Sequence, residues 1–368
     1  MAHALQMQGL RVTVFEQDES LQARPRDWNL GMFKNQTQLY ECLPEHLRKQ
    51  IEAAEVDGLG AAADEIMPVY DGASGEILKR IPLAHNVRLA RKRLLEILSA
   101  DINIKYGKRL KEVSSDRKLA TAMFEDGTLE MGNLLIGADG AHSVVRDFLV
   151  GSEDGSVVNL PFVVSSCIAK LPIEAAVKFK EYARRLMVVF HPHGYFNWIG
   201  IHDARGDSSP GEWMFMMMMS WVPSDDSHDI RSLQGDSILA DLKQRAQSFE
   251  EGIRFIWQSI PEGTQCWHNR LSHWIPREWD NINATVTLTG DAAHPMTFHR
   301  GRGFNDAVND AALFARKIKE HGISVAAVSA YEKELVSYAR EAVQDSTDTS
   351  MLFHDWQKLV QSPLLKKN

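Results

Sequence analysis

Two short apolar segments, each followed by glycine and aspartate, constrain the fold of this chain more than any other feature. Leu134–Ile136 continues into Gly137-Ala138-Asp139-Gly140, and Val286–Leu288 continues through Thr289 into Gly290-Asp291. A glycine-rich turn between a buried strand and a helix lets the backbone approach a phosphate, and free N–H groups at the start of the helix stabilise its negative charge. The two segments therefore predict an α/β fold in which anionic ligand groups can bind at strand ends.

The first residues have the pattern of half a dinucleotide-binding unit. Residues 2–8 are predicted to form a helix that ends at Gly9, and residues 11–16 alternate as a strand that finishes in Glu16. In a dinucleotide fold, an acid at this position holds an adenosine ribose through its hydroxyls. A terminal Glu is also common on surface strands, so the assignment depends on the other segments.

The chain is expected to form two units. Long strands rich in aromatic residues and Met occupy much of 187–222, whereas the flanking regions alternate short apolar strands with helices. We expect an α/β fold with a doubly wound, mostly parallel sheet and a separate antiparallel sheet. The expected parts are a first unit from residues 1–156 and 283–345, with a hairpin at 66–81 that joins the second sheet, a second unit from 157–282, and a tail at 346–368.

Composition and charge exclude several classes of protein. With 44% hydrophobic and 24% charged residues the chain is typical of a globular protein, and a formal charge of −8 without long like-charge blocks argues against a nucleic-acid partner. Four cations lie between Arg88 and Arg93 on a helical pattern. This stretch is either a solvated helix face or an anion-binding segment, and the sequence leaves both interpretations open.

No pattern predicts a disulfide, a metal site or a membrane span. Cys42, Cys167 and Cys266 are far apart, which fits a reduced, cytoplasmic setting. His294 and His299 have no third ligand at a plausible spacing. The start of the chain lacks the features of a signal peptide, and no apolar run approaches the roughly eighteen residues that a spanning helix needs.

Four segments together resemble the aromatic-hydroxylase class of FAD-dependent monooxygenases, of the salicylate and p-hydroxybenzoate hydroxylase type. These are Glu16, residues 91–98, the Gly-Ala-Asp-Gly segment with Arg146, and Gly290-Asp291, in the family's order and at similar spacing. The resemblance covers residues 2–16, 88–98, 134–146 and 286 to about 345 well, and the middle strands only in general character. It implies FAD and NAD(P)H as cofactors and an aromatic or polyketide-like small molecule as substrate.

The resemblance also implies roles for individual residues. Glu16 would bind the FAD ribose, and Arg91 would lie near the flavin and its phosphates. Asp291, with Gly290 and Pro295, would hold the ribityl chain and the pyrophosphate region. Asp139 would lie where the paths of the two cofactors meet.

The loop after Gly290-Asp291 is expected to border the flavin and departs from the family pattern. Backbone amides of Gly301, Gly303 and Asn305, at the start of a helix predicted from Asp306, would face the flavin pyrimidine and favour its electron-rich reduced form. Phe304 replaces a family glycine at which the backbone approaches the ring closely, and a glycine there can adopt a positive φ that Phe adopts only with strain. His299 replaces an apolar residue and Arg302 replaces Gln or Glu, and these two are the candidate catalytic residues.

The family's sequences have a strand and a GxGxxG turn upstream of the point where this sequence starts. We therefore expect the first strand of the parallel sheet to be missing. Either the sequence lacks an upstream segment or the chain begins at this point.

Three functions fit the sequence. The first is an FAD- and NAD(P)H-dependent monooxygenase that hydroxylates or epoxidises an aromatic or polyketide-like molecule. The second is a flavoprotein-derived scaffold without redox function that catalyses cyclisation or isomerisation, with His299 or Asp139 as acid or base. The third is a binding protein or inactive truncated homologue. Trp198, Met216, Met218 and Trp221 are either cavity residues or core.

Overall fold

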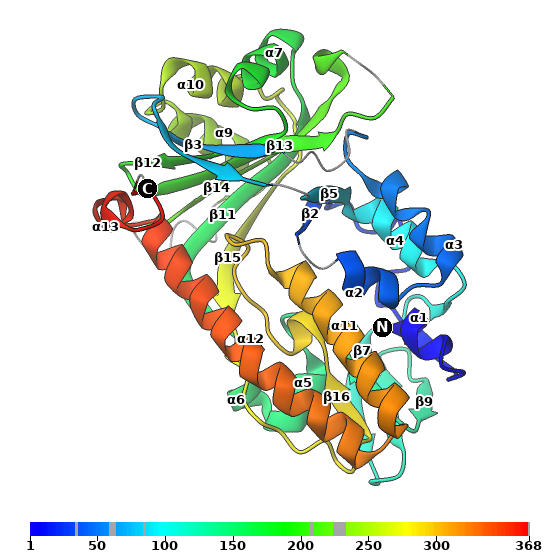
Figure 1. The fold of residues 1–368 in the computed structure, drawn as a ribbon. Helices are drawn as coiled ribbons and strands as arrows, with labels where there is room; N and C mark the ends of the chain where they lie inside the picture. Colours follow the sequence, from blue (N-terminus) through cyan, green and yellow to red (C-terminus); the bar gives the residue numbers. More distant parts are fainter. Residues whose placement is uncertain (34–35, 59–63, 84–85, 207–208, 224–232, 367–368) are drawn as a thin grey trace.

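The largest element of the structure is a seven-stranded sheet built mainly from the middle of the chain (Figure 1). The computed structural model describes residues 1–33, 36–58, 64–83, 86–206, 209–223 and 233–366. All pairs of this sheet are antiparallel except β12 with β3. Its order is β15 (Cys266–His273), β11 (Val158–Lys170), β14 (Met214–Trp221), β13 (Tyr195–Asp203), β12 (Leu186–His191), β3 (Ile66–Asp71) and β4 (Ile77–Pro82).

Side chains of β13 and β14 alternate between two apolar layers, as the period of a strand requires. The odd-numbered residues from Phe215 to Trp221 pack under helices α7 (Ile173–Tyr182), α9 (Asp236–Ala246) and α10 (Glu251–Gln258), which cover one face of the sheet in Figure 1. The opposite face is called the site face below. It is formed by Phe196, Trp198, Met216, Met218 and Ser220.

Among the described residues, those outside the large sheet and its covering helices form a second unit with four smaller sheets. Parallel pairs join β1 (Thr13–Phe15) to β6 (Asn103–Lys105) and β10 (Leu135–Gly137) to β16 (Val286–Leu288). Antiparallel sheets join β2 (Asn29–Met32) to β5 (Val87–Ala90), and β7 (Leu110–Ser115) to β8 (Ala120–Phe124) and β9 (Leu129–Gly132).

Short helices surround these sheets, and two long ones complete the unit. The short helices are α1 (Ala2–Gln6), α2 (Gln36–Glu41), α3 (Glu45–Arg48), α4 (Arg91–Ser99), α5 (Val144–Val150) and α6 (Ser152–Gly155), with 3-10 turns η1 (Ile51–Ala54) and η3 (Gly290–Ala292). A third 3-10 turn, η2 (Pro210–Glu212), belongs to the large-sheet unit and packs against α7. α11 (Gly303–His321) and α12 (Val325–Phe353) are followed by α13 (Trp356–Gln361).

The sharp turn between α11 and α12 follows from two residues. Gly322 ends α11 with φ +63°, a conformation that glycine adopts without strain. Ser324 then caps α12, because its Oγ accepts a hydrogen bond from Ala327 N at 3.2 Å. The two helices therefore lie side by side and bury Phe314 against Tyr331 above the β10–β16 pair.

The α/β class expected from the sequence is confirmed, and so is the presence of an antiparallel sheet. Instead of one doubly wound sheet, the described residues form two separate parallel pairs, because sequence patterns identify strands but not which strands hydrogen-bond. The absence of a first strand stays a prediction. The 66–81 hairpin forms β3 and β4 at one edge of the seven-stranded sheet.

α12 continues past the predicted boundary between residues 345 and 346. The polar run from Gln344 to Ser350 has weak helix propensity, and it is helical here because its hydroxyls are buried and bonded. Thr347 Oγ1 donates to Val343 O at 3.0 Å, and Ser350 Oγ donates to Ser346 O at 2.8 Å. Among the described residues, no helix is both long enough and apolar enough to cross a membrane.

Gly137→Ala is expected to destabilise the protein. A Cβ at Gly137 would lie 2.6 Å from Val145 Cβ and 2.9 Å from Leu288 Cδ2, so β10 and α5 would have to separate. We expect a loss of about 1–3 kcal/mol from this overpacking. Thermal unfolding of Gly137→Ala and of the control Gly132→Ala, whose Cβ would have no neighbour closer than 3.7 Å, checks the expectation. Equal melting temperatures for the two variants would contradict it.

Candidate functional site

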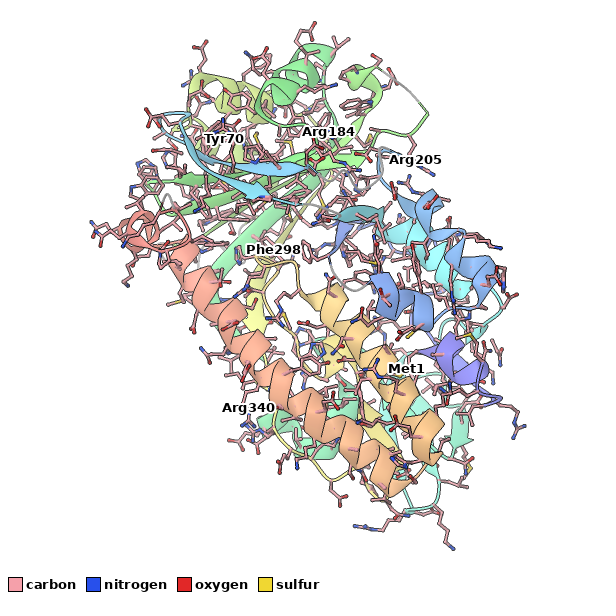
Figure 2. The ribbon with its side chains drawn as sticks, in the orientation of Figure 1. Met1, Tyr70, Arg184, Arg205, Phe298 and Arg340 are labelled. Carbon is pink, nitrogen blue, oxygen red and sulfur yellow. The ribbon has the colours of Figure 1, made fainter. Side chains whose placement is uncertain are left out.

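The segment between β16 and α11 lies at the junction of the two units. It leaves the parallel pair at Gly290, passes under the site face of the large sheet at Phe298 and enters α11 at Gly303. Figure 2 shows Phe298 where the sheet meets the start of α11. Seven residues predicted to bind the cofactor or to act in catalysis lie between Pro295 and the first turn of α11: Pro295, His299, Gly301, Arg302, Gly303, Phe304 and Asn305.

Asp310 on α11 fixes the Gly290 turn. Its Oδ2 accepts hydrogen bonds from Gly290 N at 2.7 Å and Thr289 Oγ1 at 3.3 Å and contacts His294 Nε2 at 2.8 Å, while Tyr338 OH donates to Oδ1. Burial alone would lower the pKa of His294, but the charge of Asp310 and its hydrogen bond outweigh burial and raise it. His294 and Asp310 thus form a buried ion pair that supports the loop.

Asp291 is accessible to solvent and yet enclosed by protein. Its side chain is exposed, whereas desolvation by the surrounding atoms raises its pKa, with His294 opposing that shift. These two facts agree if the carboxylate lies in a concave recess that solvent still reaches. A Cβ at Gly303 would be 3.7 Å from Asp291 Oδ1, so the recess borders the first residue of α11.

The first turn of α11 offers backbone N–H groups without a side-chain cap. Arg302 is the N-cap and its side chain forms no capping hydrogen bond, so the amides of Gly303 and Phe304 have no side-chain cap from it. Asn305 fixes the turn: its Nδ2 donates to Gly31 O at 2.8 Å and Gly301 O at 3.2 Å, and its Oδ1 accepts from Phe33 N at 3.1 Å. Gly301 has φ +62°, and its backbone lies against Phe33.

Phe304 and Arg302 do not occupy this turn in the way the sequence suggested. α11 begins at Gly303, earlier than predicted, so Phe304 is helical and is absent from the residues with positive φ in the described chain. Its ring packs against the apolar cluster around Met32 and Val308. Arg302 pairs with Asp306 at 3.3 Å and approaches Asp345 at 3.9 Å.

His299 connects the sheet to α12. Its Nε2 lies 3.0 Å from Ser220 Oγ and its Nδ1 lies 2.8 Å from Ser350 Oγ. His354 Nε2 contacts the same Ser220 Oγ at 2.9 Å. Burial and the neighbouring His354 hold the pKa of His299 well below its usual value, so the ring is neutral at physiological pH. Both ring nitrogens are occupied by hydroxyls, and the arrangement positions the loop.

Glu16 directly follows β1, and Arg91 is the first residue of α4. Glu16 Oε1 accepts a hydrogen bond from Asp18 N at 2.9 Å, and the Arg91 guanidinium lies 4.4 Å from the centroid of the Trp28 ring. Burial, followed by the charge of Arg24, lowers the pKa of Arg91, and the charges of Asp27, Asp18 and Glu16 oppose the shift. The structure describes no direct contact between Glu16 and Arg91, the two residues that were predicted to bind FAD.

Asp139 is exposed and organises the start of α5. Its carboxylate accepts hydrogen bonds from Ser143 Oγ and from Val145 N. Arg146, which is buried, donates to Gly155 O at 2.7 Å, to Ala292 O at 2.9 Å and to Ala141 O at 2.5 Å. Arg146 therefore ties the first glycine-aspartate segment to the second. Pro295 is buried, and its carbonyl accepts a hydrogen bond from Trp274 N at 3.1 Å.

The structure adds residues that the sequence analysis did not identify. Trp198, Met216 and Met218 point to the site face, whereas Trp221 points to the opposite layer. The hydroxyls of Ser220 and Ser350 could not be connected with His299 from sequence. Asp310, which the sequence analysis missed, carried a signal, because it is a polar residue buried on the inner face of a helix.

Two surface depressions lie away from the predicted site residues. No group of three or more His, Cys, Asp or Glu side chains among the described residues is arranged to hold a metal ion. Two open surface depressions of about 460 and 530 Å³ are lined by residues near Lys170 and Gly211 and by residues near His193 and Arg245. Neither includes a predicted site residue.

Known proteins resemble this chain over almost its whole length. The family described as "FAD binding domain" matches residues 92–346. The FAD-dependent monooxygenase cctM of Talaromyces islandicus is 44% identical over 369 residues, covering 99% of this chain and 92% of that protein. The FAD-dependent monooxygenase phnB of Penicillium herquei is 27% identical, covering 99% and 90%.

Solved structures share the fold. Klebsiella pneumoniae HpxO complexed with FAD and uric acid has a TM-score of 0.78 at 18% identity and covers 99% of this chain and 88% of that chain. The 2,6-dihydroxypyridine-3-hydroxylase of Arthrobacter nicotinovorans has a TM-score of 0.78 at 16% identity, covering 96% and 89%.

Acid is expected to weaken the connection between the sheet and α12. Burial lowers the pKa of His354 from 6.5 to about 4, so His354 stabilises the folded state above pH 6.5, and this stability is lost as pH falls from 6.5 toward 4. At pH 5 the loss is about 2 kcal/mol.

The measurement is the free energy of unfolding at pH 7 and pH 5 for the wild type, for His354→Phe, which keeps a ring against Phe162, and for His46→Gln at an exposed site. The pH dependence should shrink only in His354→Phe. The same dependence in all three proteins would refute the assignment.

Proposed function

This chain belongs to the FAD-dependent monooxygenases of the aromatic-hydroxylase family, and we propose that it uses NAD(P)H and dioxygen to hydroxylate or epoxidise an aromatic or polyketide-like small molecule. The observation that carries this proposal is the junction of the two units. There an accessible carboxylate, Asp291, lies beside the first turn of α11, and Phe298 of the same loop packs against the site face of the sheet.

The chemistry of these residues fits FAD. Glu16 would accept hydrogen bonds from the adenosine ribose, and Arg91 would stabilise the diphosphate charge, since a guanidinium pairs well with phosphate oxygens. Asp291 would accept hydrogen bonds from ribityl hydroxyls. Gly290, Gly301 and Gly303 would let the backbone approach the cofactor. The carbonyl of Pro295 accepts a hydrogen bond from Trp274 N, which fixes the loop.

When bound, the flavin supplies the transfer of reducing equivalents from NAD(P)H and the activation of dioxygen. The amides at the start of α11 would stabilise negative charge on the adjacent ring edge, because the helix dipole is positive there. The site face, with Trp198, Met216 and Met218, would exclude water from the reacting ring. His299, held neutral between two hydroxyls, would keep the loop at a fixed distance from the sheet.

No observation favours the non-redox alternative over this proposal. Phe304, which replaces a family glycine expected close to the flavin, packs toward Met32 and Val308, so its packing does not support that alternative. We further propose that residues 1–156 and 283–345 form the FAD-binding part and 157–282 the substrate-binding part, with α12 extending from the former to the latter.

The proposal is tested by reconstituting the purified protein with FAD and following NAD(P)H oxidation and oxygen uptake with a panel of phenols and hydroxylated polycyclic aromatics. We expect flavin absorption in the visible range and oxidation that at least one member of the panel stimulates, with formation of an oxygenated product. A protein that retains flavin but forms no oxygenated product with any of them would contradict the substrate class. A protein that does not retain flavin would contradict the site.

Asp291→Ala is expected to weaken FAD binding by about tenfold or more, since it removes a charged acceptor for ribityl hydroxyls. FAD retention is measured by equilibrium dialysis and by absorbance after gel filtration. Asp348→Ala, which removes an exposed carboxylate from α12, is the control and should retain FAD as the wild type does. Unchanged FAD affinity in Asp291→Ala, with circular dichroism showing a folded protein, would rule out this role.

A further inference from the structure

Arg88 points from the β2–β5 pair toward the large sheet. In β5, Val87 and Leu89 pack into the apolar cluster around Met32, and successive side chains of a strand point to opposite faces. Arg88 therefore faces the other way, and its partner across the strand pair is Gly31. This direction leads to Trp198 on the site face, whose ring centroid is 4.8 Å from the guanidinium carbon.

Two glycines make room for this stack. A Cβ at Gly200 would be 2.5 Å from the Trp198 ring, so only glycine allows the indole to lie along the sheet there. A Cβ at Gly31 would be 3.1 Å from Arg88 Nη1, so a larger residue would press on the guanidinium. A stacked guanidinium keeps its N–H groups in the ring plane, where they can donate in pairs to a carboxylate or another planar acceptor.

The guanidinium is enclosed and has no acid beside it in the described part of the chain. Burial, and then the charge of Arg185, lowers the pKa of Arg88 to about 10, and no carboxylate contributes to that shift. Nε is buried without a hydrogen-bond partner. The residue as a whole is nevertheless partly exposed to solvent. A charged group in such surroundings is costly, and an anion placed against it would be stabilised.

Arg88 is also close to the proposed flavin-facing turn. Asn305 binds Gly31 O and Phe33 N and also Gly301 O. The strand opposite Arg88 is therefore held directly to the turn before α11. A substrate bound between this turn and the site face would therefore lie close to Arg88.

We propose that Arg88 selects substrates that carry an ionised oxygen on an aromatic ring, either a phenolate or a carboxylate. This inference rests on the proposed function and specifies, in addition, that the substrate is an anion. Asn86, whose side chain is buried and whose Oδ1 lacks a donor among the described residues, lies beside Arg88 across Gly31. Asn86 Oδ1 would accept a hydrogen bond from a hydroxyl adjacent to the ionised oxygen of the substrate.

The test uses FAD-loaded protein and three probes. 2-Naphthoate and 2-naphthamide differ in charge but little in shape, and their dissociation constants are measured by isothermal titration calorimetry. The wild type should bind the carboxylate at least about tenfold more tightly than the amide, and Arg88→Gln should abolish this preference. 4-Nitrophenol, whose ionised form absorbs at longer wavelength, reports whether a phenolate binds: the wild type should increase its ionised fraction, and Arg88→Gln should not.

Two further variants complete the test. Arg109→Gln removes an exposed cation that pairs with Glu125, and this variant should keep the full preference for naphthoate over naphthamide. Gly31→Ala, which displaces the guanidinium while keeping its charge, should reduce the preference, and it serves if Arg88→Gln does not fold. If only one of the two anionic probes responds, that probe identifies the source of the ionised oxygen.

Equal binding of naphthoate and naphthamide by the wild type, with no ionisation of nitrophenol, overturns the proposal, and so does an unchanged preference in folded Arg88→Gln. Flavin absorbance of the wild type is measured in the same samples, and it distinguishes these outcomes from a failure of the proposed function. Loss of anion preference with flavin retained concerns Arg88 alone, whereas a wild type without flavin contradicts the function on which the inference rests.

Discussion

The carboxylate of Asp310 is the group on which the geometry of the site depends. It is fully buried on α11 and holds Gly290 and His294 on the turn that leaves the parallel pair. A carboxylate in an apolar interior is stable only when charge and hydrogen bonds compensate its desolvation. The turn supplies both, so α11 and the strand ends have one relative position. Asp291 and the first turn of α11 take their positions from it.

A second set of polar contacts sets the distance between the two units. Ser220 on the site face, His299 on the loop and Ser350 on α12 form a continuous chain of hydrogen bonds. Neutral histidines suit this role because each ring can donate through one nitrogen and accept through the other. Asn305 performs the equivalent function on the other side of the loop, toward Gly31. The space between these two connections is where flavin and substrate are proposed to meet.

Sequence alone predicted the α/β class, the hairpin and the residues that lie around the Gly290 turn. These follow from local patterns: an apolar strand, a glycine turn and a polar residue at a strand end. It did not predict the separate parallel pairs or the length of α12, because the polar run 344–350 is helical only through its buried contacts. The roles of Arg88, Gly200 and Ser220 depend on which strands are neighbours and which face a residue occupies, and no local pattern contains that information.

FAD and substrate are proposed to meet between the first turn of α11 and the site face of the sheet. A crystal structure of the protein with FAD would locate the flavin. We expect the flavin ring beside Gly301–Gly303, with the ribityl chain at Asp291 and the adenosine toward Glu16. A flavin bound away from this junction, or one whose ring is separated from the site face by the 298–305 loop, would show that the proposed site is wrong.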